Sequence, residues 1–500
     1  MSVGYDVGVI GAGYVGLTTG ACFSHLGHRV TCVDKDTHLV AQLQEGRIPF
    51  YEPGLANLVD KGARQERLRF STDLASALPE ADVVFIAVDT PRGEGDSADL
   101  SSVAAVARLI GRILSGARRE RPLVVVNKST VPVGSGDYVS MLIREGLEEA
   151  ASTGSSDEDD FVVVSNPEFL REGSAIYDAL FPDRIVVGAN SREAIDVLRT
   201  IYDPIVEQSF PTELDPRPKV AVPFVTTDLA SAEMIKYASN AFLATKVSFI
   251  NEIANLCELV SADVRSVAQG IGLDERIGSR FLNAGIGWGG SCFPKDVAAL
   301  RAVAGEYVPA LLEAAVAVND RQRKQVISKL QRELHTLKGK RVALLGLSFK
   351  PNTDDLRGSP SLRIASTLIS LGARVVAYDP VSGKKAARLL EEMKIVFDPY
   401  EALEGAHATV LVTEWEEIRS LDLRHAATLM KEPRVLVDGR NAFEPDSACE
   451  AGLTYRSFGR GNGKLRAPVT GGLMPHSGMG GDGRSARASN PLPTNIDVSA

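Results

Sequence analysis

Cys292 is the side chain of this sequence best suited to covalent chemistry. It lies in the glycine-rich stretch G-I-G-W-G-G-S-C-F-P-K-D, residues 285–296. Repeated glycine costs backbone entropy and allows the backbone to approach a ligand closely. Lys295 and Asp296 follow the cysteine, and a neighbouring cation favours the reactive thiolate. We therefore expect Cys292 to be a nucleophile, and we expect small apolar roles for the other cysteines, Cys22, Cys32, Cys257 and Cys449.

Two pairs of polar residues are spaced four apart, so each pair shares one face if its segment is helical. The first pair is Lys236 and Asn240, and the second is Glu168 and Glu172 in N-P-E-F-L-R-E-G. From spacing alone, an exposed polar pair explains Lys236 and Asn240. Like charges at this spacing weaken a helix unless a ligand or water uses them. For the two glutamates, a ligand site and a plain surface are equally supported.

A glycine turn near the N-terminus predicts a dinucleotide site. Gly11, Gly13 and Gly16 form G-A-G-Y-V-G where an apolar strand passes into a helix, the arrangement that holds a pyrophosphate on a helix N-terminus. Asp34 ends the next strand, where a carboxylate binds ribose hydroxyls and repels a 2′-phosphate. This favours NAD over NADP, although Lys35 weakens the exclusion. The strand-end segments D-T-P at 89–91 and K-S-T at 128–130 should line the cofactor.

These residues need a parallel sheet to position them. Short apolar runs alternate with helical patterns over the first 130 residues, and two further runs at 161–165 and 184–188 extend the sheet. The same order recurs from residue 340, where the first turn lacks the full glycine signature and should hold something other than a second dinucleotide. We therefore predict an α/β fold with two doubly wound, Rossmann-like parallel-sheet domains.

A long helix is expected to join the two sheets. From about 228 to 262 apolar residues recur at helical spacing without proline, with Asp228 or Ser231 as the cap. Such a helix is often both connector and dimer interface. The predicted domains are 1–210 (dinucleotide-binding), 211–325 (central helical) and 326–460 (second Rossmann-like), followed by a Gly-, Ser- and Pro-rich disordered tail at 461–500.

Composition excludes several classes of protein. The formal net charge is −9 over 500 residues without a basic block, which argues against nucleic acid or an anionic membrane as a main partner. The five cysteines lack a C-x-x-C pair, so neither a disulfide framework nor a metal site is indicated. No apolar stretch reaches the roughly 18 residues of a membrane span, and no signal-peptide layout opens the chain, so we expect a cytoplasmic protein.

Several ordered motifs carry a resemblance to a known family. They are GAGYVGL, YEPGL (51–55), KSTVPVG (128–134), NPEFLREGSAI (166–176), the Lys236/Asn240 helix, GGSCFPKD (289–296) and SFKPNTDDLRGSP (348–360). From residue 5 to about 460 the chain resembles the UDP-glucose 6-dehydrogenase family of nucleotide-sugar dehydrogenases. The resemblance implies that C6 of UDP-glucose is oxidised twice to UDP-glucuronate, a precursor for polysaccharide biosynthesis, with two NAD used in turn. In the first step Lys236 and Asp296, through a bound water, would take the alcohol proton.

The implied second oxidation depends on the cysteine. An aldehyde has no hydride to give until a nucleophile adds to it, and Cys292 would supply that nucleophile. Lys236 and Asn240 would stabilise the oxyanion of the thiohemiacetal. After the second hydride transfer, Glu168, with Thr130 nearby, would activate water to hydrolyse the thioester.

The resemblance also implies binding residues. Cofactor contacts are expected from Gly11, Gly13, Tyr14, Val15, Gly16, Asp34, Lys35, Thr90, Pro91, Ser129, Thr130, Glu172, Lys295 and Arg357. Substrate contacts are expected from Glu168, Phe169, Leu170, Glu172, Lys236, Asn240, Arg276, Phe281, Leu282, Asn283, Gly285, Gly289, Phe349, Lys350 and Arg440. Among these, Lys350 and Arg440 should reach diphosphate or sugar. Arg276 should reach the sugar from a neighbouring subunit, which implies a homodimer or a higher oligomer.

Alternatives remain open at this point. A GDP-mannose or UDP-N-acetylhexosamine dehydrogenase would share the cysteine, the lysine and the NAD turn. A single-oxidation hydroxyacid dehydrogenase of the 6-phosphogluconate type would share the dinucleotide domain and the Lys/Asn helix, but Cys292 and the third domain argue against it. A non-catalytic nucleotide-sugar sensor is the alternative from another class, and the complete set of catalytic side chains does not favour it.

The chain departs from the family pattern in a few places. Arg92 stands where a small polar residue usually follows T-P, and Leu39 stands where relatives often carry a basic residue, so the affinity for the cofactor is expected to differ. The acidic insert at 151–160 and the segment 209–225 are longer than the common pattern. These departures affect local loops and leave the implied chemistry in place.

Overall fold

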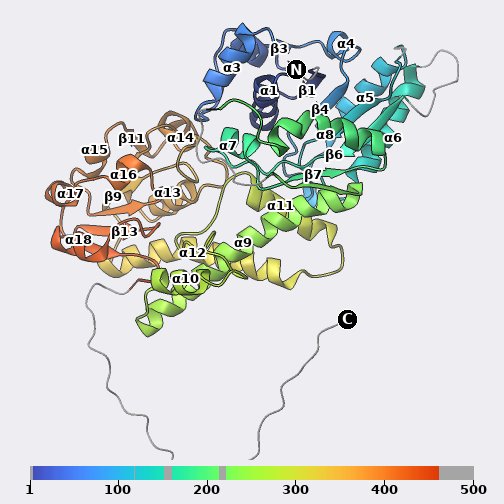
Figure 1. The fold of residues 1–500 in the computed structure, drawn as a ribbon. Helices are drawn as coiled ribbons and strands as arrows, with labels where there is room; N and C mark the ends of the chain where they lie inside the picture. Colours follow the sequence, from blue (N-terminus) through green and yellow to red (C-terminus); the bar gives the residue numbers. More distant parts are fainter. Residues whose placement is uncertain (1–3, 117–118, 151–159, 213–220, 461–500) are drawn as a thin grey trace, which may run out of the picture. The chain divides into compact units, whose positions relative to one another are not determined.

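The computed structural model describes residues 4–116, 119–150, 160–212 and 221–460 (Figure 1). The predicted tail at 461–500 and nearly all of the acidic insert at 151–160 lie outside the described residues. The described chain consists of two α/β domains, each built on one sheet, and a set of central helices, so the predicted fold class is confirmed. No helix within these ranges combines the length and the apolar character that crossing a membrane requires.

The first sheet has eight strands in the described chain, in the order β3-β2-β1-β4-β5-β6-β7-β8. Their aliphatic residues are mostly buried, as expected for strands covered on both faces. The strands are β1 (Asp6–Ile10), β2 (Arg29–Val33), β3 (Leu68–Ser71), β4 (Val83–Ile86), β5 (Leu123–Asn127), β6 (Phe161–Ser165), β7 (Ile185–Gly188) and β8 (Phe224–Thr227).

One pair in this sheet corrects the prediction of a wholly parallel arrangement. Strand β7 pairs antiparallel with β6, whereas the other neighbours are parallel. A parallel return needs a crossover that runs the length of the sheet. The only helix between these strands in this continuous described stretch, α7 (Ala175–Leu180), has six residues and spans about 9 Å, which is too short for that path. The rest of the connection is the loop that carries Glu168 and Glu172.

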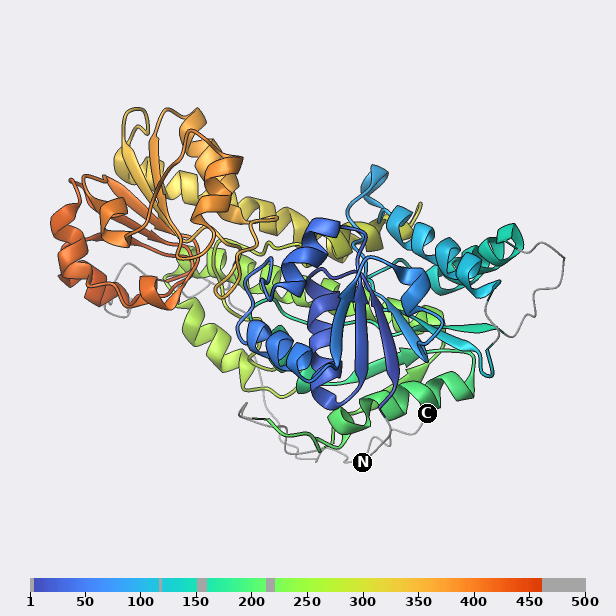
Figure 2. The same ribbon diagram turned by 90° about the horizontal axis from the view of Figure 1, so that it is seen from above.

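Helices cover both faces of the first sheet (Figures 1 and 2). Buried side chains of α1, α3, α7 and α8 form one core, and those of α5 and α6 form the other. The helices are α1 (Tyr14–Leu26), α2 (Thr37–Gln44), α3 (Leu55–Arg64), α4 (Leu74–Ala77), α5 (Ser101–Leu114), α6 (Ser135–Ala150) and α8 (Arg192–Val206). This two-sided packing leaves the strand ends free to carry functional loops.

The long helix is present almost as predicted. Helix α9 (Leu229–Val260) has Asp228 as its N-cap, whose carboxylate accepts a hydrogen bond from Ser231 N at 2.8 Å. The other central helices are α10 (Val264–Gly272), α11 (Cys292–Val303) and α12 (Ala310–Leu334). Helix α12 lies along α9 (Figure 1) and is tied to it by the Lys329–Glu258 ion pair at 2.7 Å. Strand β8 belongs to the first sheet but lies beyond residue 210, the predicted end of the first domain. Helix α12 runs without interruption across the predicted boundary at residue 325.

The second sheet repeats the order of the first six strands of the first sheet. It runs β11-β10-β9-β12-β13-β14, and its pairs are parallel. The strands are β9 (Arg341–Leu345), β10 (Arg374–Tyr378), β11 (Lys394–Val396), β12 (Ala408–Leu411), β13 (Val435–Asp438) and β14 (Thr454–Arg456). The helices are α13 (Pro360–Ser370), α14 (Gly383–Leu389), α15 (Pro399–Leu403), α16 (Glu416–Arg419), α17 (Leu423–Leu429) and α18 (Pro445–Glu450).

The first turn of the second sheet is built differently from the glycine turn of the first. Asp379 Oδ2 accepts hydrogen bonds from Leu347 N at 2.7 Å and Ser348 N at 3.0 Å. In the first turn Asp34 binds one backbone N–H, that of Ala12, so the second turn has one more backbone donor bound by its carboxylate. That this turn holds something other than a second dinucleotide stays a prediction.

Candidate active site

The glycine turn after β1 has the geometry of a phosphate-binding turn. Gly11 has a φ of +101°, and a Cβ on Gly16 would lie 1.8 Å from Gly11 O. A Cβ on Gly13 would meet nothing within 4 Å, and α1 begins there without a side-chain cap. Backbone N–H groups at an uncapped helix N-terminus are suited to bind phosphate. The turn therefore fits the pyrophosphate of a dinucleotide.

Asp34 lies beside this turn. Its Oδ2 accepts a hydrogen bond from Ala12 N at 2.8 Å, and its Oδ1 accepts one from Asp36 N at 3.0 Å. The carboxylate is thus fixed at the carboxyl edge of the sheet, where the ribose of a bound dinucleotide lies. Lys35 is exposed, and nothing in its position opposes a preference for NAD.

Six further predicted cofactor residues lie at neighbouring strand ends or on α1. Thr90 Oγ1 donates to Thr130 O at 2.8 Å, and Ser129 Oγ donates to Val88 O at 2.7 Å. Pro91 is exposed next to Thr90. On α1, the Tyr14 hydroxyl donates to Glu52, and Val15 packs against the first core.

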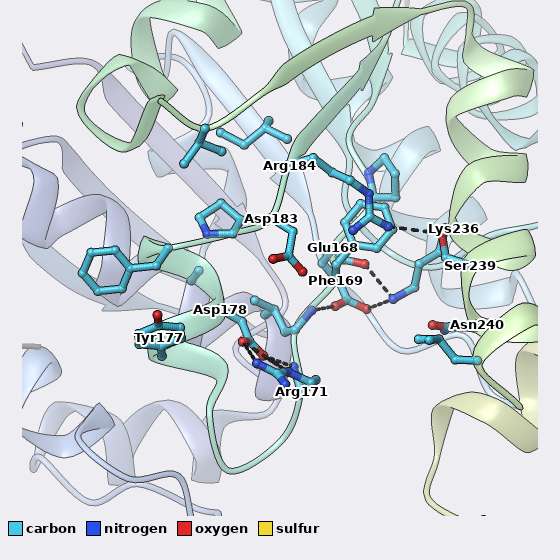
Figure 3. A pocket seen from close by; sticks show the side chains of 18 of the residues that line it. Glu168, Phe169, Arg171, Tyr177, Asp178, Asp183, Arg184, Lys236, Ser239 and Asn240 are labelled. Atoms are coloured by element: carbon cyan, nitrogen blue, oxygen red, sulfur yellow. Dashed lines mark hydrogen bonds and ion pairs between the residues drawn. The ribbon is translucent and has the colours of Figure 1, made fainter. Parts of the chain in front are cut away.

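A cavity of about 1080 Å³ opens where the loop after β6 meets α9 and the cysteine loop. Figure 3 shows its wall, with Glu168 and Phe169 on the loop facing Lys236 on α9. The cavity brings together Glu168, Lys236, Asn240 and Cys292, although as many as 124 positions separate them along the chain (292 − 168). Such a cavity is large enough for a nucleotide-sized ligand.

Cys292 is the first residue of α11 and borders this cavity. Burial raises the pKa of its thiol, and Lys236 acts in the opposite direction. Ser291 Oγ lies 3.7 Å from Cys292 Sγ. The sequence predicts Lys295 as the cation that favours the thiolate, but Lys295 instead pairs with Asp296 at 2.9 Å. The cation that acts on the thiol is thus Lys236, which comes from a helix distant in sequence.

Lys236 and Glu168 form a buried ion pair. The Lys236 ammonium donates to Glu168 O at 2.6 Å and to Glu168 Oε1 at 2.8 Å, and both side chains are less than one tenth exposed. Burial alone would lower the pKa of Lys236, but the charges of Glu168, Cys292 and Asp296 together raise it. Lys236 is therefore a cation at neutral pH. It is placed to stabilise a developing negative charge in the cavity.

Asn240 and Asp296 form the second polar pair of the site. Asn240 Nδ2 donates to Asp296 Oδ2 at 2.6 Å, and Lys295 pairs with Oδ1 of the same carboxylate. Asp296 is only 1% exposed; the ammonium of Lys295 balances its charge, and the neutral amide of Asn240 adds a hydrogen bond. Lys295 also reaches Thr90 Oγ1 at 3.5 Å, which places the pair next to the predicted cofactor edge.

Glu172 joins three segments of the chain. It accepts hydrogen bonds from Ser291 Oγ at 3.3 Å and Thr353 Oγ1 at 2.8 Å, and Arg357 lies 3.6 Å away. Burial, followed by the charge of Asp355, raises the pKa of Glu172 to about 7. The loop after β6, the cysteine loop and the segment before α13 thus meet at one carboxyl group.

The predicted substrate residues differ in their surroundings. Phe169, Leu170, Phe281 and Asn283 line the cavity, with Leu170 N also bound by Glu168 Oε2 at 2.6 Å. Leu282 is buried in a core cluster. Gly285 and Gly289 are close backbone contacts, because a Cβ on them would lie 2.4 Å from Gly439 O and 2.3 Å from Gly358 O.

Three basic residues that are predicted to bind substrate, Arg276, Lys350 and Arg440, are not among the residues that line this cavity. Arg440 donates to Val412 O at 2.8 Å and to Gly287 O and Phe349 O at 3.2 Å, which anchors both segments. Lys350 lies 5.6 Å from the centre of the Phe349 ring, and burial lowers its pKa. Arg276 pairs with Asp274 at 2.6 Å and its side chain is 89% exposed. Contacts of these residues with substrate, including contact from a neighbouring subunit, remain predictions.

Sequence reasoning missed several residues that shape the cavity. Lys128, Asn166 and Tyr202 contact one another at its inner wall. Arg184 lies 3.9 Å from the centre of the Phe169 ring and donates to Ser239 Oγ at 3.2 Å (Figure 3). Lys128 and Asn166 belong to the K-S-T and N-P-E motifs, where a polar residue directly after a buried strand was the available signal. Thr130, in contrast, is not among the residues that line this cavity.

Comparison with protein families covers most of the chain. Residues 5–206 match the NAD binding domain of the UDP-glucose/GDP-mannose dehydrogenase family, residues 230–321 match its central domain, and residues 343–445 match its UDP binding domain. Along the chain, the three matches correspond to the first sheet, the central helices and the second sheet.

Individual relatives and solved structures agree with this match. A UDP-glucose 6-dehydrogenase of Rhizobium meliloti (strain 1021) is 48% identical over 459 residues, which cover 90% of this chain and 99% of that protein. The UDP-glucose 6-dehydrogenase TuaD of Bacillus subtilis (strain 168) is 45% identical over 457 residues, covering 91% and 93%. The solved UDP-glucose dehydrogenase of the hyperthermophilic archaeon Pyrobaculum islandicum has a TM-score of 0.81 and 36% identity, covering 92% of this chain and 98% of that one.

Proposed function

Because this chain belongs to the UDP-glucose/GDP-mannose dehydrogenase family, we propose that it oxidises C6 of UDP-glucose twice, with NAD, to give UDP-glucuronate. The observation that carries this proposal is the meeting of Cys292, Lys236 and Glu168 at one cavity. A thiol, a cation and a carboxylate are the three groups that a covalent aldehyde oxidation requires. NAD held at the glycine turn would supply the hydride acceptor, with one NAD molecule for each oxidation.

In the first oxidation, Asp296 takes the proton of the C6 alcohol, directly or through water. The raised pKa of Lys236 supports this division of roles, because a lysine that stays charged is a poor base. Lys236 instead stabilises the negative charge that develops on the alcohol oxygen. Asn240 holds Asp296 in position through the hydrogen bond at 2.6 Å.

In the second oxidation, Cys292 gives its proton to water and its sulfur bonds to the aldehyde carbon. The resulting oxyanion is held by Lys236, with Asn240 as a second donor. Loss of hydride from this carbon leaves a thioester on Cys292. Glu168 then takes a proton from water as the water oxygen bonds to the thioester carbon, and the carbon–sulfur bond breaks. Thr130, whose carbonyl oxygen accepts a hydrogen bond from Thr90, supports this step.

We also propose a homodimer formed along α9. Phe242, Phe249 and Leu256 recur at every seventh position and are 64%, 50% and 52% exposed. An exposed apolar stripe at this spacing is typical of a helix that packs against a partner helix. Leu259 and Val260 continue it and are 80% and 74% exposed. The second subunit would bring Arg276 toward the neighbouring sugar site.

A cytoplasmic location is the compartment that we propose. All five cysteines of the described chain are free, including the exposed Cys449. Free thiols are typical of a reducing compartment. The free Cys292 thiol is also the form that the proposed reaction needs.

An NADH-formation screen tests the choice of substrate. UDP-glucose, GDP-mannose and UDP-N-acetylhexosamines are compared at equal concentration with NAD. We expect the highest kcat/KM with UDP-glucose. A higher value with GDP-mannose or a UDP-N-acetylhexosamine would contradict the proposed substrate and would leave the family in place.

A further inference from the structure

Lys128 is a buried cation that the proposed reaction leaves unexplained. It directly follows β5 and is 8% exposed. Its ammonium donates to Asn166 Oδ1 at 3.0 Å and Tyr202 OH at 3.2 Å, and lies 5.7 Å from the centre of the Tyr202 ring. Both hydrogen-bond partners are neutral groups. Because a buried charge without an ion pair is costly, its presence beside the cavity calls for a role.

The contacts of Lys128 fix the start of the N-P-E loop. Asn166 Oδ1 accepts from Lys128 and also from Tyr202 OH at 2.7 Å, while Asn166 Nδ2 donates to Val186 O at 2.7 Å. The amide is therefore held from three sides, by the end of β5, by α8 and by β7. Glu168 follows only two residues later, so the same contacts limit where its carboxylate lies.

Lys128 also acts on Glu168 through its charge. Both residues line the cavity with Lys236 and Cys292. Burial would raise the pKa of Glu168, but Lys236, a hydrogen bond from Leu170 N and Lys128 together lower it. Burial lowers the pKa of Lys128 to about 8, while Glu168 acts in the opposite direction and Lys236 adds to the lowering. Lys128 and Lys236 are thus two cations that act on one carboxylate.

The two cations have different tasks during the reaction. Lys236 must turn toward the oxyanion when Cys292 adds to the aldehyde, and again when water adds to the thioester. At those moments Lys236 supports Glu168 less, and a buried carboxylate without a cation takes up a proton. A protonated Glu168 cannot take the proton of water. Lys128 is held by Asn166 and Tyr202 and does not need to move.

We propose that Lys128 is a positioning residue for thioester hydrolysis, which holds Asn166 in place and keeps Glu168 ionised while Lys236 is engaged with the oxyanion. The inference rests on the proposed function. In the hydrolytic step Glu168 accepts the proton of water, the water oxygen bonds to the thioester carbon, and the carbon–sulfur bond breaks to release the carboxylic acid. The sulfur leaves as thiolate and regains a proton, which returns Glu168 to its ionised form.

The test separates the charge of Lys128 from its hydrogen bond. Lys128→Met removes both, Lys128→Arg keeps the charge, and Tyr202→Phe removes a hydrogen bond to the same Asn166 oxygen without changing any charge. Each full-length variant is mixed with UDP-glucose and excess NAD at pH values between 4 and 9 and quenched with acid at intervals, and the Cys292 thioester is followed by mass spectrometry. Circular dichroism verifies that each variant is folded.

We expect Lys128→Met to move the acidic limb of thioester hydrolysis upward by about one pH unit, which slows hydrolysis by up to about tenfold at pH values below the wild-type limb. The acidic limb of Lys128→Arg should lie at the same pH as that of the wild type, because arginine keeps the charge. Tyr202→Phe should slow hydrolysis by the same factor at every pH. The inference is overturned if the acidic limb of Lys128→Met lies at the same pH as that of the wild type, or if Tyr202→Phe moves the limb as far as Lys128→Met does. In either case the proposed function stands. A wild type that forms no thioester overturns the proposed function and this inference with it.

Discussion

The Lys236 ammonium lies 2.6 Å from the carbonyl oxygen of Glu168 and 2.8 Å from its carboxylate, so one cation binds the backbone and the side chain of the same residue. Helix α9 and the loop after β6 are joined at this point. The contact positions the carboxylate for water and the ammonium for an oxyanion. Both half-reactions of the proposed oxidation depend on it.

Replacing Lys236 by Met is expected to reduce kcat by about 10²- to 10⁴-fold, because both the oxyanion and the buried Glu168 lose their cation. Steady-state NADH formation measures the loss. Lys324→Met on the exposed face of α12 is the matched control and should keep wild-type activity. A kcat of Lys236→Met within a few-fold of the wild type would contradict the assigned role.

Replacing Cys292 by Ser is expected to stop the reaction after the first oxidation or at a slowly hydrolysed ester, because a hydroxyl adds to the aldehyde and leaves less readily than a thiol. Quenched samples analysed by mass spectrometry distinguish these two forms. Cys449→Ser, which removes an exposed thiol, serves as the control and should turn over normally. Unchanged turnover of Cys292→Ser would remove the cysteine from the mechanism.

Gly13→Ala is expected to weaken NAD binding, whereas Gly16→Ala is expected to destabilise the fold. A Cβ on Gly13 meets open space, so this variant should fold but bind NAD at least about tenfold more weakly, because the methyl group blocks the approach of a phosphate. A Cβ on Gly16 would overlap Gly11 O, so this variant should lose stability. Thermal unfolding and NAD titration separate the two effects. Full NAD affinity in Gly13→Ala would place the pyrophosphate elsewhere.

Glu233 predicts a dependence of stability on pH. Its carboxylate accepts hydrogen bonds from Gly134 N at 2.7 Å and Gly136 N at 2.8 Å at the start of α6, and burial raises its pKa from 4.5 to about 7. The folded state therefore binds this proton more tightly than the unfolded state. The resulting stability is present below about pH 4.5 and is lost as the pH rises through about 7.

Urea unfolding of the wild type and Glu233→Gln between pH 5 and 8 checks this prediction. The free energy of unfolding of the wild type, measured relative to the variant, should fall across that range, because the glutamine cannot ionise. Contributions from other titrating groups cancel in the difference. A difference that is independent of pH, or that rises with pH, would show that the pKa of Glu233 is not raised in the folded protein.

Much of the fold follows from local patterns in the sequence. The aliphatic runs at β1, β2, β4 and β5 and the uninterrupted periodicity of α9 are local signals, and the structure confirms them. The antiparallel pairing of β7 was not predictable in the same way, because the direction of a strand depends on the path of its connection. The partner of Lys295 was also not predictable, since Asp296 competes with Cys292 for its charge.

The candidate site was likewise predictable from the sequence only in part. Cys292, Lys236, Asn240 and Glu168 carry motif signals, and the structure brings them to one cavity. The roles assigned to them stay proposals. Lys128 lies 38 positions from Asn166 and 74 from Tyr202, so its contacts arise only from the packing of β5, β6 and α8. Burial of its charge could not be inferred from the motif alone.

The stoichiometry of NADH formation tests the central claim most directly. A limiting amount of UDP-glucose is consumed to completion with excess NAD, and the NADH absorbance is compared with the sugar added. Oxidation through a Cys292 thioester predicts close to two NADH per UDP-glucose, with UDP-glucuronate as the product. One NADH per sugar with release of the free aldehyde would contradict the account.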